Sequence, residues 1–329
     1  MKKVLIVTFS EDNECIDMVS DAIKSKGGEV IRFDTDLYPS EYSLSLQYIN
    51  GKWSNILNTK DSSYGLDDLE AVWYRRLRIG DSMKGQMEKK YLGPSLEESK
   101  RTFLGMLNSL DVFHFDSYLK IRHAEIKQLQ LKVAENLGLK IPKTLITNNA
   151  GDVREFNKQC VDGLITKMQS SFAIYEGEDE HVVFTNVLSD EDLKNLDDIQ
   201  SCPMQFQEKI EKKLELRVTV IGDKIFSAAI DSQKSELSKD DWRKQGLELI
   251  NDWEEYALPD DIQEKLLKFM DYFKVNYGAA DFILTPDDEL YFLESNPAGE
   301  FFWLERTNPH FPLSDAIANV LLGKAKRRF

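Results

Sequence analysis

Asp281, Glu294 and Asn296 carry side-chain oxygens of the kind that bind a divalent cation, and their spacing predicts that they meet. They lie on two apolar runs that flank a Pro-Asp-Asp turn, a pattern typical of a β-hairpin. With a four-residue loop, Thr285 would pair with Leu290. Counting back along both arms then places Asp281 opposite Glu294, with Asn296 on the same face. Two facing carboxylates repel unless a cation lies between them, and ligands of this kind suit Mg²⁺ beside phosphate oxygens. The hairpin therefore predicts a metal and nucleotide site.

Two lysines would supply positive charge for the phosphates of such a nucleotide. Lys127 lies on a helix predicted over 124–137, and Lys167 closes a short apolar strand predicted over 163–167. Either lysine alone would most often be an ordinary surface residue. Two lysines on two separate elements are the arrangement that a triphosphate needs.

A strand predicted over 202–210 ends in Gln207, Glu208, Lys209 and Ile210. A strand end of this kind can recognise adenine through backbone N–H and C=O groups, although the signal is weak on its own. The stretch therefore becomes a nucleotide candidate only in combination with the lysines and the hairpin.

The strand predicted over 215–221 alternates, so that Glu215, Arg217 and Thr219 share one face while apolar residues pack inward. A solvated sheet face is the ordinary interpretation. In the functional interpretation, Glu215 contacts the ribose or metal region and Arg217 faces the transferred phosphate. Arg243, next to a tryptophan in a polar loop, offers a second arginine or is a loop residue of no consequence.

A third basic group follows two aromatic residues. Arg75 and Arg76 continue a strand predicted over 71–78. The strand could simply end in solvated charges, or the arginines could form a clamp for a substrate carboxylate, because paired arginines beside aromatics read carboxylates well. The two interpretations have equal weight.

The elements that must position these residues divide into three predicted lobes: 1–118, 119–205 and 206–329. The first opens β-α-β but lacks a G-x-G-x-x-G turn, so a dinucleotide site is disfavoured. A helix is predicted over 94–110, followed by a linker near 113–119. The second lobe is a small α+β unit. The third holds the strands 215–221 and 224–230, a helix over 261–273 and the hairpin. The fold class is therefore α/β and α+β.

Composition limits the class of function. A net charge of −15 over 329 residues argues against nucleic-acid binding. No segment is long and apolar enough to span a membrane, and the three scattered cysteines suit a reducing, cytoplasmic compartment. The basic tail 324–328 is expected to be a frayed, solvated end.

Taken in chain order, the two lysines, the Gln-Glu-x-Ile strand end, the Glu-x-Arg strand and the Asp…Glu-x-Asn hairpin resemble the ATP-grasp ligases over roughly residues 120–300. The segments Val72-Trp-Tyr-Arg-Arg76 and Asn296-Pro-Ala-Gly-Glu-Phe-Phe-Trp303 extend the similarity to the whole chain. With them the chain looks like the graspetide (microviridin-type) peptide ligases, and most like the macrolactone-forming branch, the ω-ester ligases. The fold expected from this resemblance is an ATP-grasp fold with an N-terminal Rossmann-like pre-ATP-grasp lobe, a small central lobe and a C-terminal antiparallel-sheet lobe.

The resemblance implies that ATP and Mg²⁺ phosphorylate an Asp or Glu side chain of a ribosomally made precursor peptide. A Thr or Ser hydroxyl of the same peptide then closes an ester ring, whereas related enzymes use a Lys amine and form an amide. The implied roles are phosphate binding by Lys127 and Lys167, adenine binding by Lys209 and Ile210, metal binding by Asp281, Glu294 and Asn296, and contact with the γ-phosphate and acyl phosphate by Arg217 and Arg243.

The resemblance also implies an acidic pair that contacts an arginine-bearing leader segment of the peptide. It falls on Glu191 and Asp192, although Ser-Asp-Glu-Asp is equally an ordinary helix N-terminus. A homodimer is compatible with the family. One departure concerns the lid over the phosphates, since residues 169–177 contain a single glycine where many ATP-grasp enzymes have several.

Two other functions remain open at this point. One is an amide-forming ATP-grasp ligase that acts on a Lys amine, a protein tail or a free amino acid. The other is a nucleotide-binding regulator without turnover. The repulsive carboxylate pair argues against the regulator, because a protein without turnover has no need for it.

Overall fold

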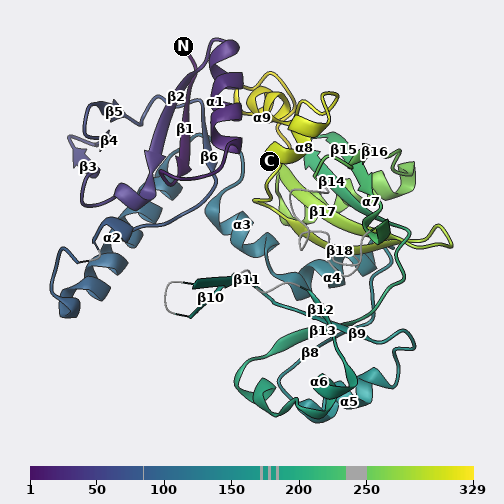
Figure 1. The fold of residues 1–329 in the computed structure, drawn as a ribbon. Coiled ribbons are helices and arrows are strands. Elements are labelled where there is room, and N and C mark those ends of the chain that lie inside the picture. Colours follow the sequence, from purple (N-terminus) through teal and green to yellow (C-terminus); the bar gives the residue numbers. More distant parts are fainter. Residues whose placement is uncertain (84, 171–172, 177–178, 183–184, 235–249) are drawn as a thin grey trace.

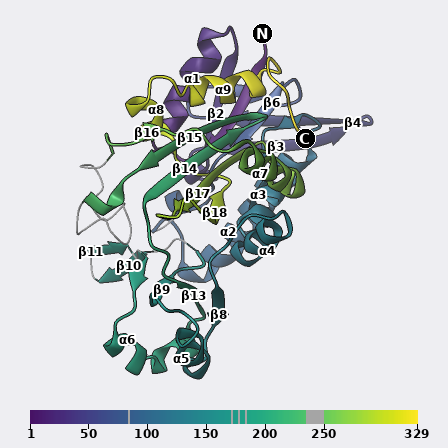
Figure 2. The ribbon, with the colours of Figure 1, turned by 90° about the vertical axis from the view of Figure 1, so that its right-hand side faces the viewer.

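The computed structural model describes residues 1–329 apart from 84, 171–172, 177–178, 183–184 and 235–249. The chain forms three lobes, each built on its own sheet (Figure 1). The N-terminal and C-terminal lobes lie side by side, and the central lobe lies beyond the C-terminal sheet (Figures 1 and 2). Among the described helices, none is long and apolar enough to cross a bilayer.

The N-terminal lobe is built on a parallel sheet. Its elements are β1 (Lys3–Thr8), α1 (Cys15–Ser25), β2 (Glu29–Asp34), η1 (Thr35–Leu37), β3 (Ser43–Ile49), β4 (Lys52–Asn58), β5 (Ser63–Gly65), β6 (Ala71–Tyr74), η2 (Asp81–Met83), α2 (Lys89–Ser109) and β7 (Phe113–His114). The parallel strands run in the order β2-β1-β6-β7, and β3, β4 and β5 form a separate antiparallel sheet. Val4 and Ile6 pack with α1, whereas Leu5 and Val7 pack with α2. A parallel sheet buried on both faces explains the uninterrupted apolar run in β1.

Two predictions for this part of the chain are wrong in detail. The strand predicted over 71–78 ends at Tyr74, so the arginines follow it rather than continue it. The predicted linker 113–119 contains β7, which adds an edge to the parallel sheet. The helix predicted over 124–137 is confirmed as α4 (Lys127–Asn136), which begins later than predicted because Ile126 is extended. A separate short helix, α3 (Tyr118–Ala124), precedes it.

The central lobe has a mixed composition of short elements. They are β8 (Thr144–Thr147), α5 (Ala150–Asn157), β9 (Leu164–Lys167), β10 (Ala173–Glu176), β11 (Asp179–Val182), β12 (Asn186–Val187), α6 (Asp190–Lys194), η3 (Asp197–Ser201) and β13 (Met204–Glu208). The main sheet is antiparallel in the order β12-β9-β13-β8, and β10 and β11 form a separate hairpin. Strand β13 runs across the lobe boundary predicted between 205 and 206.

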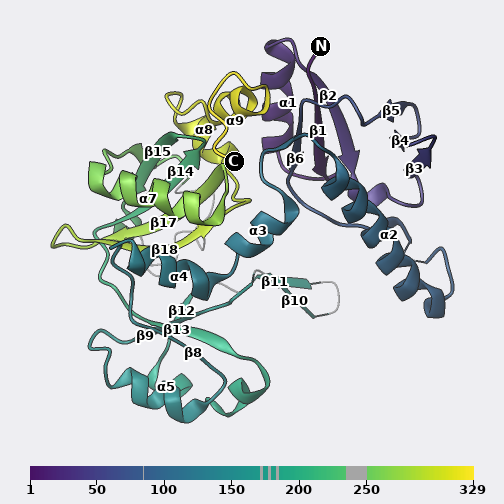
Figure 3. The same ribbon diagram turned by 180° about the vertical axis from the view of Figure 1, so that it is seen from behind.

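The C-terminal lobe carries the predicted metal hairpin. Its elements are β14 (Leu214–Ile221), β15 (Lys224–Ile230), η4 (Ser232–Lys234), β16 (Glu254–Glu255), α7 (Asp260–Phe273), β17 (Tyr277–Leu284), β18 (Leu290–Asn296), α8 (Phe302–Thr307) and α9 (Leu313–Leu321). The antiparallel sheet has the order β16-β15-β14-β17-β18. As predicted, Leu216, Val218 and Val220 pack inward, against α7 and α4 (Figure 3). The opposite face is not solvated, since Thr219 is buried and α8 and α9 pack over part of that face.

The C-terminal tail contradicts the expectation of a frayed end. Arg327 donates hydrogen bonds to the carbonyl of Leu321 at 2.7 Å and to Glu70 of the N-terminal lobe at 2.6 Å. The backbone N–H of Arg328 donates to the side chain of Asn276 at 2.9 Å. The tail therefore ties the N-terminal and C-terminal lobes together.

Candidate active site

The predicted hairpin forms, but its loop is longer than expected. Leu290 pairs with Leu284 rather than with Thr285. The N–H of Thr285 instead donates to the carbonyl of Glu289 at 2.9 Å, which makes a five-residue loop from Thr285 to Glu289. Asp288 takes a left-handed conformation, with φ of 60°, that closes this loop.

A β-bulge then restores the predicted register at the metal site. The pairs Phe282–Phe292 and Asp281–Glu294 follow one another along the ladder, so Leu293 is an extra residue on β18. The shift at the loop and the shift at the bulge cancel. The predicted opposition of Asp281 and Glu294 is confirmed, although the predicted loop that led to it was wrong.

Four charged side chains lie close together across this sheet. Arg217 and Asp281 are partners on β14 and β17, and Arg217 Nη1 lies 2.9 Å from Asp281 Oδ1. On the other side, Lys127 Nζ lies 2.7 Å from Glu294 Oε2. The four side chains are at most 30% exposed, so these charges attract more strongly than on an open surface. Each proposed metal-binding carboxylate therefore contacts a cation that the sequence assigned to the phosphates.

Lys127 also connects the C-terminal sheet to the central lobe. It is the first residue of α4, and its amine donates to the carbonyl of Met168 at 3.1 Å. Met168 follows Lys167, the second predicted phosphate ligand, which is half-buried at the end of β9. The structure thus brings the chain segments of the two predicted lysines together.

The predicted adenine segment lies at the end of β13, beside β9. Gln207 is fully buried, and its Nε2 donates to Thr144 Oγ1 at 2.9 Å. Its Oε1 accepts no hydrogen bond from the described residues. Glu208 is bound by Lys143, whose backbone N–H and Nζ lie 2.8 and 3.1 Å from the carboxylate and whose pKa is raised by this hydrogen bond.

The backbone of the same segment is partly used within the lobe. The N–H of Lys209 donates to the carbonyl of Gly163 at 2.9 Å, which anchors the strand end. Ile210 is half-buried. Glu215, predicted at the ribose or metal, forms an ion pair with Lys212 at 3.0 Å, with both side chains 14% exposed. The nucleotide roles of these residues stay predictions.

The two arginines after β6 bind groups within the protein. Arg75 is 3% exposed, and its Nη1 donates to the carbonyls of Ala298 and Gly299. Arg76 is 33% exposed and pairs with Asp12 at 3.0 Å and Glu300 at 2.7 Å. The substrate-carboxylate clamp stays a prediction, for which Arg76 is the more accessible of the two.

The predicted leader contact lies on α6. Glu191 and Asp192 are both exposed there. Asp192 accepts hydrogen bonds from the backbone and hydroxyl of Ser189 in a capping box, and the Ser189 hydroxyl lowers the pKa of Asp192. The ordinary interpretation of this segment as a helix N-terminus is confirmed, and the leader contact stays a prediction. Arg243 lies outside the described residues.

Gln130 and Asp116 are site-supporting residues that sequence reasoning missed. Gln130, on α4, binds both backbone groups of Ser295, between Glu294 and Asn296. Asp116 accepts hydrogen bonds from the backbone N–H groups at the start of β17. A glutamine between two leucines of an amphipathic helix was the available signal for Gln130.

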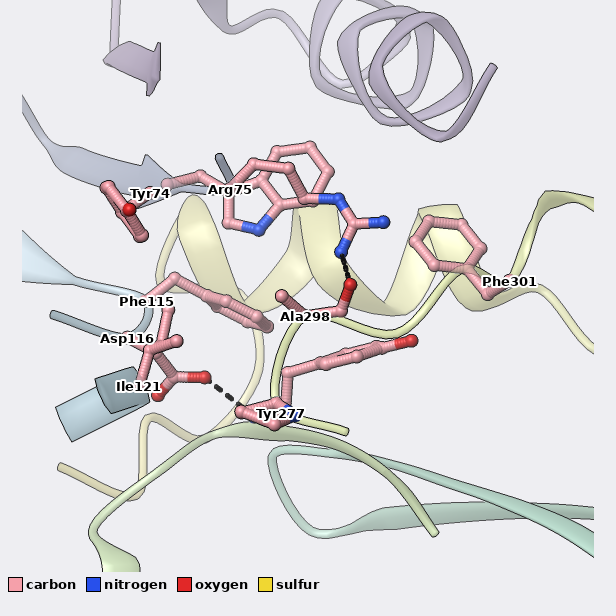
Figure 4. Close-up of a pocket in the computed structure, with 10 residues that line it drawn as sticks. Tyr74, Arg75, Phe115, Asp116, Ile121, Tyr277, Ala298 and Phe301 are labelled. Atoms are coloured by element: carbon pink, nitrogen blue, oxygen red, sulfur yellow. Dashed lines mark hydrogen bonds between the residues drawn. The ribbon is translucent and has the colours of Figure 1, made fainter. Parts of the chain in front are cut away.

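A small cavity lies where Asp116 and the β6 end meet the C-terminal lobe. It measures about 10 Å³, room for one water molecule. Figure 4 shows the guanidinium of Arg75 on one side and the rings of Phe115 and Tyr277 on another. The hydroxyl of Tyr277 donates to the carbonyl of Gly299 at 2.8 Å, and burial raises the pKa of this tyrosine. The cavity adjoins the loop that follows Asn296, so the wall behind the metal hairpin is built by both lobes.

The residues present fit a metal and a nucleotide. Two adjacent carboxylates and a carboxamide are a donor set that Mg²⁺ accepts, and Lys127 and Arg217 already touch those carboxylates. The buried Oε1 of Gln207 suits a donor such as the amino group of adenine.

Comparisons with known proteins identify the family of this chain. Residues 3–122 match the family model described as the MvdD pre-ATP grasp domain. A RiPP-associated ATP-grasp ligase from Chryseobacterium gregarium, solved in complex with ADP and a leader and core peptide, is 44% identical with a TM-score of 0.95, over 100% of this chain and 98% of that chain. No curated protein matched the chain.

Two further solved structures are also similar over the full length. The macrocyclase MdnC from Microcystis aeruginosa MRC, solved with the precursor peptide MdnA, is 46% identical with a TM-score of 0.88, over 98% of this chain and 99% of that chain. MdnB from the same organism is 34% identical with a TM-score of 0.82, over 98% of this chain and 99% of that chain. The expected fold, an ATP-grasp fold preceded by a pre-ATP-grasp lobe, is confirmed, and the chain belongs to the RiPP-associated, or graspetide, family of ATP-grasp macrocyclases.

Proposed function

We propose that this enzyme uses Mg²⁺ and ATP to phosphorylate Asp or Glu side chains of a ribosomally made precursor peptide and then closes macrocyclic esters with Thr or Ser hydroxyls. The observation that carries the proposal is the group Arg217, Asp281, Glu294 and Lys127, in which two facing carboxylates meet two cations. The ester product is supported by the resemblance to the ω-ester branch.

The first step is transfer of a phosphoryl group. An oxygen of the substrate carboxylate attacks the γ-phosphorus, the bond to the β–γ bridging oxygen breaks, and ADP leaves. Asp281, Glu294 and Asn296 would hold Mg²⁺, which offsets the charge that builds on the phosphates. Lys127 and Lys167 would hold the phosphate chain, and Arg217 would face the transferred group. The same role is proposed for Arg243, which lies outside the described residues.

The second step closes the ring. The hydroxyl oxygen of Thr or Ser attacks the carbonyl carbon of the acyl phosphate, the carbon–oxygen bond to phosphate breaks, and the hydroxyl proton is lost to solvent. Phosphorylation is needed because a free carboxylate is a poor electrophile and phosphate is a good leaving group. ATP is thus converted to ADP and phosphate, and the peptide loses one water per ring.

Nucleotide and peptide would approach from different elements. The end of β13, with Gln207, Glu208, Lys209 and Ile210, receives the adenine, and Glu215 lies toward the ribose. The leader contacts the exposed acidic surface of α6 at Glu191 and Asp192, since one or both carboxylates can pair with an arginine of the leader. The core would reach the phosphates past Arg76.

Mass spectrometry after incubation with ATP, Mg²⁺ and the precursor peptide tests the proposal. The peptide to use is a short chain rich in Thr, Ser, Asp and Glu with an arginine in its leader, to be sought among the open reading frames beside the gene. We expect ADP release that depends on the peptide, loss of one water mass per ring, and regain of that mass in hydroxide, which opens esters.

Two outcomes would contradict the proposal at different levels. Rings that survive hydroxide would show that the product is an amide and not an ester, and the proposed ligase activity would still hold. ADP release that does not depend on the peptide, with no loss of mass, would remove the macrocyclase function. Asp287→Asn, at the exposed tip of the same hairpin, is the control that should retain full activity.

A further inference from the structure

Gln130 holds the segment that carries two of the proposed metal ligands. It lies on α4 and is 2% exposed. Its Oε1 accepts the N–H of Ser295 at 2.8 Å, and its Nε2 donates to the carbonyl of Ser295 at 2.8 Å. Ser295 lies between Glu294 and Asn296, so one side chain binds both backbone groups at the centre of the ligand segment.

Arg75, from the opposite lobe, binds two residues of the loop that follows Asn296. Its Nη1 donates to the carbonyl of Ala298 (Figure 4). The same Nη1 donates to the carbonyl of Gly299 at 3.2 Å. The hydroxyl of Tyr277 donates to the same Gly299 carbonyl at 2.8 Å. The backbone after Asn296 is therefore bound by a cation and a hydroxyl from two different lobes.

Gly299 lies so close to the sheet that only a residue without a side chain fits at this position. A Cβ added at Gly299 would lie 2.7 Å from the Cβ of Ala279 and 3.3 Å from the Cβ of Asn296. Ala279 is also the strand partner of Asn296. The loop thus lies in contact with the sheet at the metal ligand itself, and any side chain at 299 would displace it.

The burial of Arg75 does not serve stability alone. Its Nε and Nη2 are buried and have no hydrogen-bond partner among the described residues. A buried cation with unsatisfied donors costs stability, and an apolar residue would fill the same space without that cost. Within the described part of the chain, the hydrogen bonds that account for this arginine are those to the two loop carbonyls.

We propose that Arg75 and Gln130 are positioning residues for the metal site, which fix Glu294 and Asn296 by holding the backbone between them and the loop that follows Asn296. The inference rests on the proposed metal site. Supporting residues of this kind typically change metal affinity by about 10–100-fold when removed. Because one lies on α4 and the other follows β6, the geometry of the ligands depends on how the N-terminal lobe and α4 pack on the C-terminal sheet.

Calorimetry of ADP binding with and without Mg²⁺ tests this inference on the full chain. The quantity compared is the ADP dissociation constant without Mg²⁺ divided by the ADP dissociation constant with Mg²⁺. This ratio reports the coupling between metal and nucleotide. We expect Arg75→Met and Gln130→Met to reduce this ratio about ten-fold or more, while ADP affinity without Mg²⁺ changes less than two-fold. Arg75→Lys, which keeps a donor for one carbonyl, should recover part of the ratio.

Arg327→Met is the matched control. Arg327 is another arginine that joins the N-terminal and C-terminal lobes and binds backbone carbonyls, but its partners are Glu70, Val320 and Leu321. We expect this variant to unfold at a lower temperature with an unchanged ratio. A purely structural role for Arg75 and Gln130 would give the same pattern and would overturn the inference.

Gly299→Ala moves the same loop without removing either side chain. It should also reduce the ratio, and it keeps the test decisive if a methionine variant fails to fold. A wild-type ratio near one would instead refute the proposed metal site. A clear wild-type ratio that Gly299→Ala and every methionine variant that folds leave intact would refute the positioning role alone.

Discussion

Lys127 Nζ lies 2.7 Å from Glu294 Oε2, so a lysine expected to bind phosphate touches a carboxylate expected to bind metal. The contact joins the start of α4 to the end of β18. It lowers the repulsion between Glu294 and Asp281, which face each other across the hairpin. When phosphates arrive, the same amine has an anion of higher charge to bind.

Lys127→Met should separate these two roles. Loss of a charge-assisted contact of about 1.5–3 kcal/mol predicts that ADP binds about 10- to 100-fold more weakly. Mg²⁺ added without nucleotide should raise the unfolding temperature more in the variant than in the wild type, because the lysine no longer offsets the carboxylate charge. Calorimetry and thermal shift measure the two effects.

Lys132→Met is the control for this experiment, since Lys132 is an exposed residue of the same helix. It should leave both measurements unchanged. An equal response of the wild type and Lys127→Met to Mg²⁺ alone would show that the lysine does not compete with metal at Glu294.

Asp281→Asn combined with Glu294→Gln should stop turnover. The change removes both negative charges that would hold Mg²⁺, and electrostatic groups of this importance are each worth on the order of 10²–10³-fold in rate. Arg217 also loses its ionic partner at 2.9 Å, so no gain in stability is expected from the removed repulsion. Peptide-dependent ADP release is the measurement, and activity within ten-fold of the wild type would refute the metal assignment.

The sequence predicted the inward face of β14 and the opposition of Asp281 and Glu294 because both depend on local patterns. Alternation in β14 identified Leu216, Val218 and Val220 as an inward face, and the structure confirms this. The turn and the apolar arms predicted that Asp281 faces Glu294. A periodicity of two residues specifies which side chains share a face, and that was sufficient for these residues.

Local sequence patterns could not predict the bulge or the contacts of Gln130 and Arg75. Leu293 resembles any apolar strand residue in sequence, so its role as the extra residue was not visible. Gln130 and Ser295 are 165 residues apart, and Arg75 and Ala298 are 223 apart. Such contacts depend on how separate lobes pack, and a single sequence contains no periodic signal for that.

Glu191→Gln should weaken binding of the leader peptide without changing the affinity for nucleotide. Glu191 is exposed on α6, and an exposed ion pair contributes little, so neutralisation should raise the leader dissociation constant only about two- to five-fold. Charge reversal in Glu191→Lys should have a larger effect that diminishes at high salt. Fluorescence anisotropy of a labelled leader peptide measures both.

Asp192→Asn differs from its neighbour because it also changes the capping box with Ser189. It should lower both the unfolding temperature and the leader affinity, whereas Glu191→Gln should lower the leader affinity alone. Asp198→Asn, an exposed carboxylate of the same lobe, is the control. Leader binding that is insensitive to Glu191→Lys would exclude this surface as the leader site.

Asp116 predicts a pH dependence of stability. Its carboxylate is fully buried, and burial raises its pKa to about 8, although the N–H groups of Asn276 and Tyr277 and the charge of Lys120 act in the opposite direction. Between the ordinary value of about 4 and this raised value, the folded protein binds more protons at this site than the unfolded chain. The contribution of Asp116 to the free energy of unfolding therefore falls as pH rises from about 4 to about 8.

Asp116→Asn removes the titrating carboxylate. It also removes one of the two side-chain oxygens that accept hydrogen bonds from the N–H groups of Asn276 and Tyr277. A backbone N–H that loses its acceptor in a buried position predicts a loss of about 1–3 kcal/mol. Urea unfolding of both proteins at several pH values between 5 and 9 measures the difference, in which the other titrating groups cancel. We expect the free energy of unfolding of the wild type to exceed that of the variant most at low pH. The difference should narrow up to about pH 8 and be constant above it. A gap that widens with pH would mean that the carboxylate is held ionised by its N–H donors, and the raised pKa would be refuted.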